Sequence, residues 1–449
     1  MGAEPMTPIS TIIMAGGMGT RMRSPLPKVL HELCGLPMLA WVARAAREAG
    51  AEDVVVVTSP ETAEPIAAAL PEVRVAVQSP ANGTGHAVMV GLEAVPASSE
   101  RVVVLSGDTP LIEPGTIRRA IEACSGAAGG ALVSARLAPP HAYGRVVRDG
   151  DRVARIVEAR DASAHELAID EFNVGLYCFR RDALAAALSR LTSHNAQGEL
   201  YLTDVVALIA ADGASAVAVD EPAPETAEGV NTLVELAERE ARLRARILRD
   251  HMLAGVRVVD PATTYVDGTV ELAEGCRLEP NVMLRGSTTV GAGSVLGPHV
   301  MIDDSTIGER CKVGPFAYLR PGCTLAEGAQ VGRFVELKNA GLGAGAKVPH
   351  LSYIGDADIG AGSNLGASTI TANYDGHDKH RTTIGEDVKT SVHSSLIAPV
   401  TIGDGAIVAA GSVITDDVEA GALAIARPRQ TTKPGYAERA GARRKEGQQ

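Results

Sequence analysis

The feature that most constrains the fold is a six-residue repeat that fills the second half of the 449-residue chain. Aliphatic residues recur at every sixth position from Leu272, and after one-residue slips the series continues as far as Ile414. Glycine often follows the aliphatic residue, as in Val290-Gly291. A hexapeptide period is typical of a parallel β-helix, in which each turn stacks inward aliphatic side chains and bends at small residues. The sequence therefore predicts a β-helix beyond Gly255.

The repeat has one clear interruption, from Thr371 to Thr383, which contains Asn373-Tyr374-Asp375-Gly376. An excursion from a solenoid has no stacking role, so we expect this segment to be a ligand loop. The polar tail that begins at Thr431 is rich in Ala, Gly, Arg, Lys and Gln, and we expect it to be mostly disordered.

The first half alternates short apolar runs with helical segments. Val54 to Val57 and Val102 to Leu105 are apolar runs of strand length, and the Ala-rich segment Glu61 to Leu70 lies between them in the sequence. This alternation predicts a doubly wound α/β domain, with hairpins added from about Ala131. Ser106-Gly107-Asp108 ends a predicted strand, at the edge where such sheets bind ligands.

A glycine cluster follows the first apolar run, Thr11 to Met14. Gly16-Gly17 and Gly19 could close backbone amides around an anion, and Arg21 and Lys28 bring positive charge to the same place. The cluster lacks the Gly-Lys-Ser/Thr of a Walker loop and the glycine spacing of a dinucleotide fold. Without the two cations, a tight strand-to-helix turn would explain the cluster equally well.

Residues 232–252 contain neither Gly nor Pro and mix charges with Leu, Ile and Ala at helical spacing, so they predict a helix. We therefore expect three parts: an α/β domain over residues 1–231, a linker helix over 232–254, and a β-helix domain with a short polar tail over 255–449.

Composition limits the partners and the location. The chain has 42 Lys and Arg against 54 Asp and Glu, a net charge of -12, and lacks long basic runs at its ends, which argues against nucleic acid as a partner. The apolar runs are far shorter than the roughly 20 residues that span a bilayer, and the first residues hold no signal-peptide core, so we expect a cytoplasmic protein with no membrane insertion. The six cysteines form no Cys-x-x-Cys pair, so we expect reduced, buried thiols and not a zinc site.

Several longer motifs together resemble one protein family. They are Gly17 to His31, Gly83 to Ala87 (Gly-Thr-Gly-His-Ala), Gly107 to Ile112, Tyr143 to Arg145, Pro315 to Gly322, His350 to Asp356 and Asn373 to Gly376. On these motifs the chain, from about Ile12 to Gln430, is identified as a member of the bifunctional bacterial N-acetylglucosamine-1-phosphate uridyltransferase and glucosamine-1-phosphate acetyltransferase (GlmU) family. The resemblance implies a Rossmann-like nucleotidyltransferase domain, a linker helix and a left-handed parallel β-helix.

The resemblance also implies two reactions that supply a cell-wall precursor. Acetyl-CoA acetylates glucosamine-1-phosphate, and the N-acetylglucosamine-1-phosphate formed reacts with UTP to give UDP-N-acetylglucosamine and pyrophosphate. The second reaction accumulates negative charge between repelling phosphates, so its site must supply cations. By resemblance, Arg21 and Lys28 hold the triphosphate, and Asp108 and Asn231 bind Mg²⁺. An Asp in a Gly-Asp turn is more often a turn residue, but these companions favour the metal role for Asp108.

The other residues carried over for UTP or the UDP-sugar lie in three groups. They are Met14, Gly16 and Gly17 in the glycine loop, Gln78, Gly83 and Thr84 near the uracil, and Gly144, Glu158 and Asn173 near the sugar. Ala81 replaces a second glutamine of the uracil region, and the family's Leu-Ala-Ala-Gly is Met14 to Gly17 here. The preference for UTP is therefore less firmly implied than nucleotidyl transfer.

For acetyl transfer, the amine must lose a proton, and histidine is the natural base near neutral pH. His350 matches the family's base, although a lone histidine is more often structural, and Arg320 and Lys338 match the cations that hold the sugar phosphate. Glu336 could orient or balance the charge of this site. The remaining residues carried over are Tyr353 and Asn364 for the sugar phosphate, Asn373 for both substrates, and Ala367, Tyr374, Ala410 and Arg427 for acetyl-CoA.

One departure affects the acetyl-CoA site: Ser391-Val392 stands where the family has Gly-Ser, and His393 stands where an acidic residue is usual. The affinity for CoA is therefore the least firmly implied property. A β-helix of this type has flat faces that can pack against one another, and members of the family complete each acetyl site with neighbouring subunits. The resemblance therefore implies a homotrimer. Two alternatives remain open: a nucleotidyltransferase with a purely structural β-helix, and a non-catalytic regulatory subunit of the same architecture.

Overall fold

The computed structural model describes residues 8–17, 19–126 and 128–446. The chain divides into two compact units, Met1–Ala245 and Arg246–Gln449, and the division falls inside helix α8 (Leu233–Leu253), the helix predicted over 232–252. No helix in the described part of the chain is both long and apolar enough to cross a membrane.

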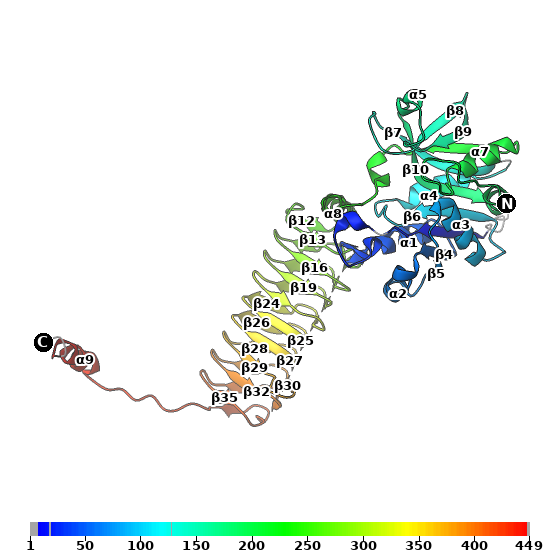
Figure 1. Cartoon of the computed structure of the whole chain (residues 1–449). Helices are drawn as coiled ribbons and strands as arrows, with labels where there is room; N and C mark the ends of the chain where they lie inside the picture. Colours follow the sequence, from blue (N-terminus) through cyan, green and yellow to red (C-terminus); the bar gives the residue numbers. More distant parts are fainter. Residues whose placement is uncertain (1–7, 18, 127, 447–449) are drawn as a thin grey trace. The chain divides into compact units, whose positions relative to one another are not determined.

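The first unit is built on a sheet with the strand order β11-β7-β10-β6-β1-β4-β5, which Figure 1 shows with helices packed around it. These strands are β1 (Ile9–Met14), β4 (Asp53–Thr58), β5 (Arg74–Val77), β6 (Arg101–Ser106), β7 (Ala128–Arg136), β10 (Glu171–Arg180) and β11 (Ser215–Asp220). Strands β1, β4, β5 and β6 are parallel, whereas β10 runs antiparallel to both β6 and β7. A hairpin of β8 (Arg145–Asp149) and β9 (Arg152–Val157) pairs with β10, as the sequence predicted for this region.

The remaining elements of this unit are short. The helices are α1 (Met38–Glu48), α2 (Pro60–Ala69), α3 (Gly83–Ala94), α4 (Pro114–Ala123), α5 (Ala164–Leu167), α6 (Arg181–Leu188) and α7 (Asp204–Ala211). The 3-10 turns and a two-stranded ribbon are η1 (Thr20–Met22), η2 (Lys28–Leu30), η3 (Pro224–Ala227), β2 (Glu32–Leu33) and β3 (Leu36–Pro37).

Alternate side chains of the central strands enter two different cores. Val54 and Val103 join one cluster with residues of α1 and α4, whereas Val55 and Val104 join another with residues of α3, α6 and α7. Because both faces are covered, the strands are apolar throughout instead of alternating with polar residues. The doubly wound α/β prediction is confirmed.

The second unit consists of stacked coils whose parallel strands form two sheets. The ten-stranded sheet contains β12 (Arg257–Val258), β15 (Arg277–Leu278), β18 (Val295–Leu296), β21 (Lys312–Val313), β24 (Gln330–Arg333), β26 (Lys347–His350), β28 (Asn364–Leu365), β31 (Lys389–Thr390), β34 (Ile407–Val408) and β36 (Leu423–Ala424). The other sheet contains β13 (Tyr265–Val266), β14 (Glu271–Leu272), β16 (Met283–Arg285), β17 (Thr289–Val290), β19 (Met301–Asp303), β20 (Thr306–Ile307), β22 (Tyr318–Leu319), β23 (Thr324–Leu325), β25 (Glu336–Leu342), β27 (Tyr353–Ile359), β29 (Ile370–Ala372), β30 (Thr382–Ile384), β32 (Ser395–Ile397), β33 (Val400–Ile402) and β35 (Val413–Ile414).

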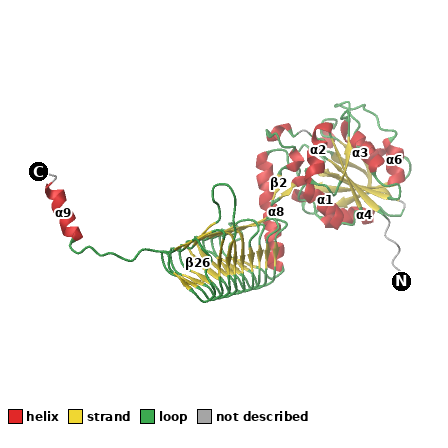
Figure 2. Cartoon of the chain, turned by 90° about the horizontal axis from the view of Figure 1, so that it is seen from below, coloured by secondary structure: helices red, strands yellow, loops and turns green. Residues whose placement is uncertain are grey.

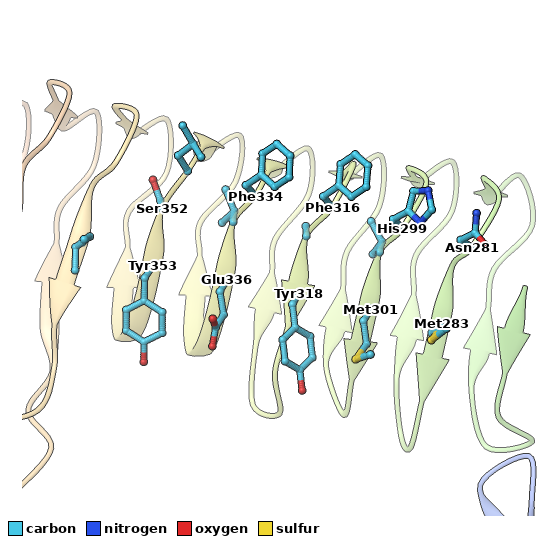
Figure 3. A pocket seen from close by; sticks show the side chains of 15 residues that line it. Asn281, Met283, His299, Met301, Phe316, Tyr318, Phe334, Glu336, Ser352 and Tyr353 are labelled. Carbon is cyan, nitrogen blue, oxygen red and sulfur yellow. The ribbon is translucent and has the colours of Figure 1, made fainter.

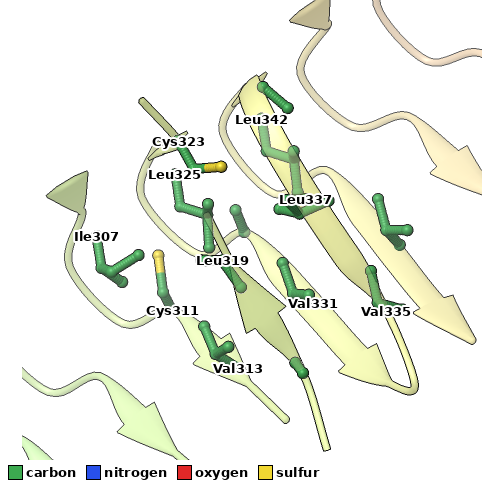
Figure 4. Close-up of a cluster of buried hydrophobic side chains, with 14 of the residues drawn as sticks. Ile307, Cys311, Val313, Leu319, Cys323, Leu325, Val331, Val335, Leu337 and Leu342 are labelled. Atoms are coloured by element: carbon green, nitrogen blue, oxygen red, sulfur yellow. The ribbon is translucent and has the colours of Figure 1, made fainter. Parts of the chain in front are cut away.

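The hexapeptide residues form the core of these coils. Leu278 pairs with Leu296 on the next coil, three hexapeptides further along the chain, and both side chains are fully buried. Figure 4 shows how the aliphatic side chains and the thiols of Cys311 and Cys323 pack inside the coils. All six cysteines are free and buried, as predicted. The β-helix prediction is confirmed.

Two segments depart from the coil pattern. The predicted excursion lies between β29 and β30, contains an antiparallel bridge between Tyr374 and Lys379, and is the loop that projects from the coils in Figure 2. The tail was expected to be mostly disordered, but the structure contains helix α9 (Tyr436–Glu446) there, so this expectation is wrong for that segment. The Ala, Glu, Arg and Lys residues of that segment are strong helix formers, which outweighs its polar composition.

Candidate functional site

The glycine loop of the first unit lies at the carboxyl ends of β1 and β6. The Gly107 N–H donates to the Met14 carbonyl at 2.9 Å, which joins the two strand ends. The loop forms one wall of a cavity of about 360 Å³, and a second cavity of about 280 Å³ adjoins it. Both cavities are lined by Met14, Thr84 and Asp108, so Asp108 lies where they meet.

Four predicted polar residues converge at this junction. Lys28 Nζ lies 2.5 Å from Asp108 Oδ2 and 3.4 Å from Asn231 Oδ1, and Arg21 Nη2 donates to Asn231 Oδ1 at 2.8 Å. The second Asp108 oxygen accepts from Ser106 Oγ at 2.7 Å. The structure brings these four residues together, although Arg21 and Asn231 lie 210 positions apart along the chain.

Gly19 allows Lys28 to reach this position. Its φ is +58°, and a β-carbon at residue 19 would lie 2.5 Å from the β-carbon of Lys28. Any side chain at residue 19 would therefore displace Lys28, so the glycine cluster positions a cation as well as exposing backbone amides.

The oxygen atoms at the junction suit a hard divalent cation. The Asp108 carboxylate and the Asn231 amide oxygen are ligands that Mg²⁺ prefers, and Mg²⁺ commonly takes one or two protein oxygens together with water and substrate phosphates. Within residues 8–17, 19–126 and 128–446, no group of three or more His, Cys, Asp or Glu could hold a metal by itself. The residues present therefore fit a Mg²⁺ ion shared with a phosphate ligand.

The larger cavity has an amide at its far end. Gln78 is 6% exposed, and its Nε2 donates to the Gly83 carbonyl at 3.1 Å and lies 3.2 Å from His86 Nδ1. Gly83 opens helix α3 with a φ of +87°, and a β-carbon there would lie 2.5 Å from the Leu200 carbonyl oxygen. Ala81 lines the same cavity, so the departure from the family lies within this site.

The smaller cavity is lined by Glu158 and Asn173, two of the three residues predicted near the sugar. Glu158 Oε1 accepts from Thr203 Oγ1 at 3.2 Å, and Asn173 Nδ2 donates to the Tyr177 hydroxyl at 2.6 Å. The Asn173 N–H donates to the Gly144 carbonyl. Burial raises the pKa of Glu158, so the ionised form of this carboxyl group destabilises the folded protein.

In the second unit, neighbouring coils bring several predicted residues around one buried carboxylate. Lys338 Nζ lies 3.7 Å from Asp356 Oδ2, Asn373 Nδ2 donates to the same oxygen, and Asn339 Nδ2 donates to Oδ1 at 2.7 Å. Burial opposes the ionisation of Asp356, but the hydrogen bonds from the two Asn side chains and the charge of Lys338 hold its pKa below the usual value.

Asp356 and Lys379 are site residues that the sequence reasoning missed. Asp356 lies inside the motif that carried the resemblance, but nothing in the linear sequence indicates that it faces Lys338 and Asn373. The Lys379 side chain contacts that of Lys338, and this contact with a like charge lowers the pKa of Lys379. The excursion therefore places a second lysine, Lys379, beside Lys338.

Tyr353 and Arg320 adjoin this cluster. A β-carbon on Gly355 would lie 2.5 Å from the Tyr353 hydroxyl and 2.8 Å from Asn373 Nδ2, so these two polar groups border the same glycine. Arg320, on the coil before Lys338, forms an ion pair at 3.2 Å with Glu336, which lies on the same strand as Lys338.

The other predicted residues of this unit follow one edge of the coils. The His350 carbonyl accepts from the Ser368 N–H, the Ala367 carbonyl accepts from the His393 N–H, and the Val392 carbonyl accepts from the Gly411 N–H. A β-carbon on Gly411 would lie 3.7 Å from Arg427 Cδ. His350, Ala367, Ala410 and Arg427 thus lie at or beside successive positions of one edge, and Val392, which departs from the family, is 46% exposed on it.

Two predicted residues stand outside these clusters. Tyr374, on the excursion, is 59% exposed, and its hydroxyl donates to the Gly376 carbonyl at 2.8 Å. Asn364 is exposed on β28, where it pairs in register with Lys347.

A ladder of exposed rings, not anticipated from the sequence, runs along the coils beside Tyr353. The rings of His299, Phe316 and Phe334 stack with centroid distances of 4.8 and 5.2 Å, and Phe316 and Phe334 are 47% and 57% exposed. Figure 3 shows the three rings side by side on successive coils, with Tyr353 at one end of the groove that they border. The groove has a volume of about 990 Å³. The signal in the sequence was the recurrence of bulky residues once per coil at an exposed corner.

Comparisons with known proteins match both units. Residues 11–202 match the model of the MobA-like NTP transferase domain, and residues 381–416 match the bacterial transferase hexapeptide (six repeats). Proteins named "Bifunctional protein GlmU" match along nearly the whole chain. That of Trichlorobacter lovleyi is 43% identical, over 95% of this chain and 97% of its own. That of Kineococcus radiotolerans is 44% identical, over 95% and 91%, and that of Mycolicibacterium gilvum is 43% identical, over 97% and 92%.

Proposed function

The chain belongs to the family of bifunctional GlmU proteins, and from this premise we propose that each unit catalyses one of two consecutive reactions. The second unit acetylates glucosamine-1-phosphate with acetyl-CoA. The first unit joins the resulting N-acetylglucosamine-1-phosphate to UTP, giving UDP-N-acetylglucosamine and pyrophosphate. The observation that carries the first assignment is the convergence of Arg21, Lys28, Asp108 and Asn231 at the junction of two cavities.

In uridylyl transfer, an oxygen of the sugar phosphate attacks the α-phosphorus of UTP, and the bond to the pyrophosphate oxygen breaks. Lys28 and Arg21 lower the repulsion between the reacting phosphates and stabilise the charge on the leaving group. Asp108 and Asn231 would hold Mg²⁺, which neutralises phosphate oxygens when it is bound. In the structure Asp108 and Asn231 are paired with Lys28 and Arg21, so we infer that phosphate oxygens take over contacts now made inside the protein.

The two cavities supply the geometry for this attack. UTP would occupy the larger cavity, with its base near Gln78 and its phosphates at the glycine loop. The sugar would occupy the smaller cavity, where Glu158 and Asn173 offer an acceptor and a donor for hydroxyl and acetamido groups. Asp108 lines both cavities, so the α-phosphorus and the attacking oxygen would meet beside it.

In acetyl transfer, the amine of glucosamine-1-phosphate attacks the thioester carbonyl, and the thiol of CoA leaves. His350 would remove the amine proton, while Arg320, Lys338 and Lys379 hold the sugar phosphate. Asp356 balances these cations and orients Asn373. The edge that leads from His350 to Arg427 would carry acetyl-CoA, with Arg427 placed to meet one of its phosphates.

We also propose that the protein is a homotrimer. The ladder of His299, Phe316 and Phe334 continues to the exposed side chain of Leu351, and together they form an apolar surface beside Tyr353 of the proposed acetyl site. A contiguous apolar surface of this kind is typical of an interface between protein chains. A self-associated form would bury these rings and set a neighbouring copy next to the site.

One experiment separates the two activities. The purified protein is mixed with glucosamine-1-phosphate, acetyl-CoA, UTP and Mg²⁺, and free thiol and pyrophosphate are followed separately. Both products should appear, with pyrophosphate after thiol. Pyrophosphate release from supplied N-acetylglucosamine-1-phosphate without thiol release would indicate a nucleotidyltransferase with a structural β-helix. Neither product would indicate a regulatory subunit.

A further inference from the structure

The amide of Gln78 has a fixed orientation at the base end of the larger cavity. Its nitrogen lies 3.1 Å from the Gly83 carbonyl oxygen and 3.2 Å from His86 Nδ1. Its oxygen lies on the side of the glycine loop, 3.6 Å from where a β-carbon on Gly16 would be. Among the residues that the structure describes, none donates a hydrogen bond to this oxygen.

The Gly83 carbonyl identifies which atom of the Gln78 amide is the nitrogen and which is the oxygen. A carbonyl oxygen accepts and cannot donate, so the Gln78 atom beside it must be the NH₂ group. An amide NH₂ donates and cannot accept, so His86 Nδ1 must be the acceptor of the second hydrogen bond. His86 is therefore neutral, with its proton on Nε2. Both Gln78 protons are then used inside the protein, and only Oε1 remains for a ligand.

A lone acceptor at this position discriminates between pyrimidines. Uracil has a donor at N3, whereas cytosine has an acceptor there. Gln78 Oε1 would accept from uracil N3–H and repel cytosine N3. The N–H groups of Gly83 and Thr84, the first two residues of α3, would meet an adjacent uracil carbonyl. If the amide were rotated, its NH₂ group would face the base and could donate to cytosine instead.

We propose that His86 is a positioning residue that, together with the Gly83 carbonyl, sets the preference for UTP by holding the Gln78 amide in this orientation. The proposal rests on the proposed uridylyl transfer. His86 does not line the cavity, so it acts only through Gln78. Ala81 lines the same cavity and offers no side-chain hydrogen bond, so the part of the discrimination that side chains supply depends on the orientation of a single amide.

The test compares variants that keep or remove the acceptor. His86→Phe keeps a ring without an acceptor, and His86→Asn places an amide oxygen close to the position of Nδ1. With His86→Phe, the ratio of kcat/KM for UTP to kcat/KM for CTP should fall about tenfold, mainly through a higher KM for UTP and a lower KM for CTP. With His86→Asn the ratio should return to within about threefold of the wild-type value.

Binding of UTP and CTP without sugar phosphate, measured by calorimetry, should show the same change of ratio without relying on catalysis. His86→Leu gives the same comparison if His86→Phe does not fold. An unchanged ratio in the acceptor-free variants, or an equal loss for UTP and CTP, would overturn the proposal and indicate a purely structural role. A wild-type protein that forms no UDP-sugar would instead contradict the proposed function.

Discussion

Both oxygens of the Asp108 carboxylate already have partners, Lys28 on one side and Ser106 on the other. A ligand that replaces Lys28 at Oδ2 must therefore carry positive charge, because the carboxylate would otherwise lose a charge-assisted contact. This requirement favours a metal ion that arrives with the nucleotide phosphates, since Lys28 can then move to a phosphate oxygen.

Replacing Asp108 with Asn should abolish one reaction and spare the other. Asp108→Asn removes the negative charge that holds both Lys28 and a divalent cation, so Mg²⁺-dependent UDP-sugar formation should fall about a hundredfold or more. Thiol release from acetyl-CoA should stay within about twofold of the wild-type rate, because that site lies in the other unit. The converse is expected for His350→Ala. Glu122→Gln on the exposed face of α4 is a matched control. Near-normal UDP-sugar formation by Asp108→Asn would refute the metal assignment.

Glu158 links function to stability. Its pKa is raised by burial, with the hydrogen bond from Thr203 acting in the opposite direction. A carboxyl group whose folded pKa exceeds its unfolded value of about 4.3 stabilises the fold below that pH, and this contribution is lost as the pH rises through the folded pKa. Glu158→Gln is neutral at every pH, so at pH 7 its melting temperature should exceed that of the wild type by about 2 °C. The difference should disappear near pH 4, while UDP-sugar formation falls. A lower melting temperature for the variant at pH 7 would show that Glu158 stabilises the fold.

At the scale of elements, each coil of the second unit depends on its buried aliphatic residues. Leu296 is fully buried, whereas Leu423 on β36 is 60% exposed. Leu296→Ala should lower the free energy of unfolding of this unit by about 2 to 5 kcal/mol, because it removes packed side-chain atoms and leaves a cavity. Leu423→Ala should change it by less than about 0.5 kcal/mol. Urea denaturation followed by circular dichroism provides the measurement, and equal effects of the two substitutions would contradict the assigned core.

The apolar strands of the α/β domain and the six-residue repeat of the β-helix could be recognised in the sequence, because burial directly requires both patterns. A buried strand such as Val102–Leu105 is apolar throughout, and a coil repeats its inward residues every six positions, so the helix α8, the α/β sheet and the β-helix could all be predicted. Contacts between coils are not encoded in that period. Asp356 meets Lys338 and Asn373 only because residues from three different coils align, and the six-residue repeat does not show which outward-facing side chains meet. The corner residue Phe334 likewise faces outward, where the inward repeat carries no information.

At the scale of the whole molecule, the exposed ladder should control self-association. Phe334→Asp places a charge at the end of the stacked rings, next to Phe316, and this charge would be costly to bury between copies of the chain. Sedimentation should show a trimer for the wild type and a monomer for the variant at about micromolar concentration. Acetyl transfer should fall about tenfold or more with it, while UDP-sugar formation stays normal.

Leu423→Asp is the control, because Leu423 on β36 is about as exposed as Phe334. This variant should remain trimeric. A monomeric wild type with full acetyl transfer would refute the proposed assembly, because the site would then be complete within one chain.

The stacking of similar coils also makes the second unit divisible. Each coil pairs only with the coils before and after it, as Leu278 does with Leu296, and the proposed acetyl site begins at Arg320. A whole coil of three hexapeptides could therefore be deleted or duplicated between Leu278 and Leu296 without changing the spacing of any residue in that site. Evolution and protein engineering can thus adjust the length of this unit in fixed steps, as with a modular spacer, while its chemistry remains the same.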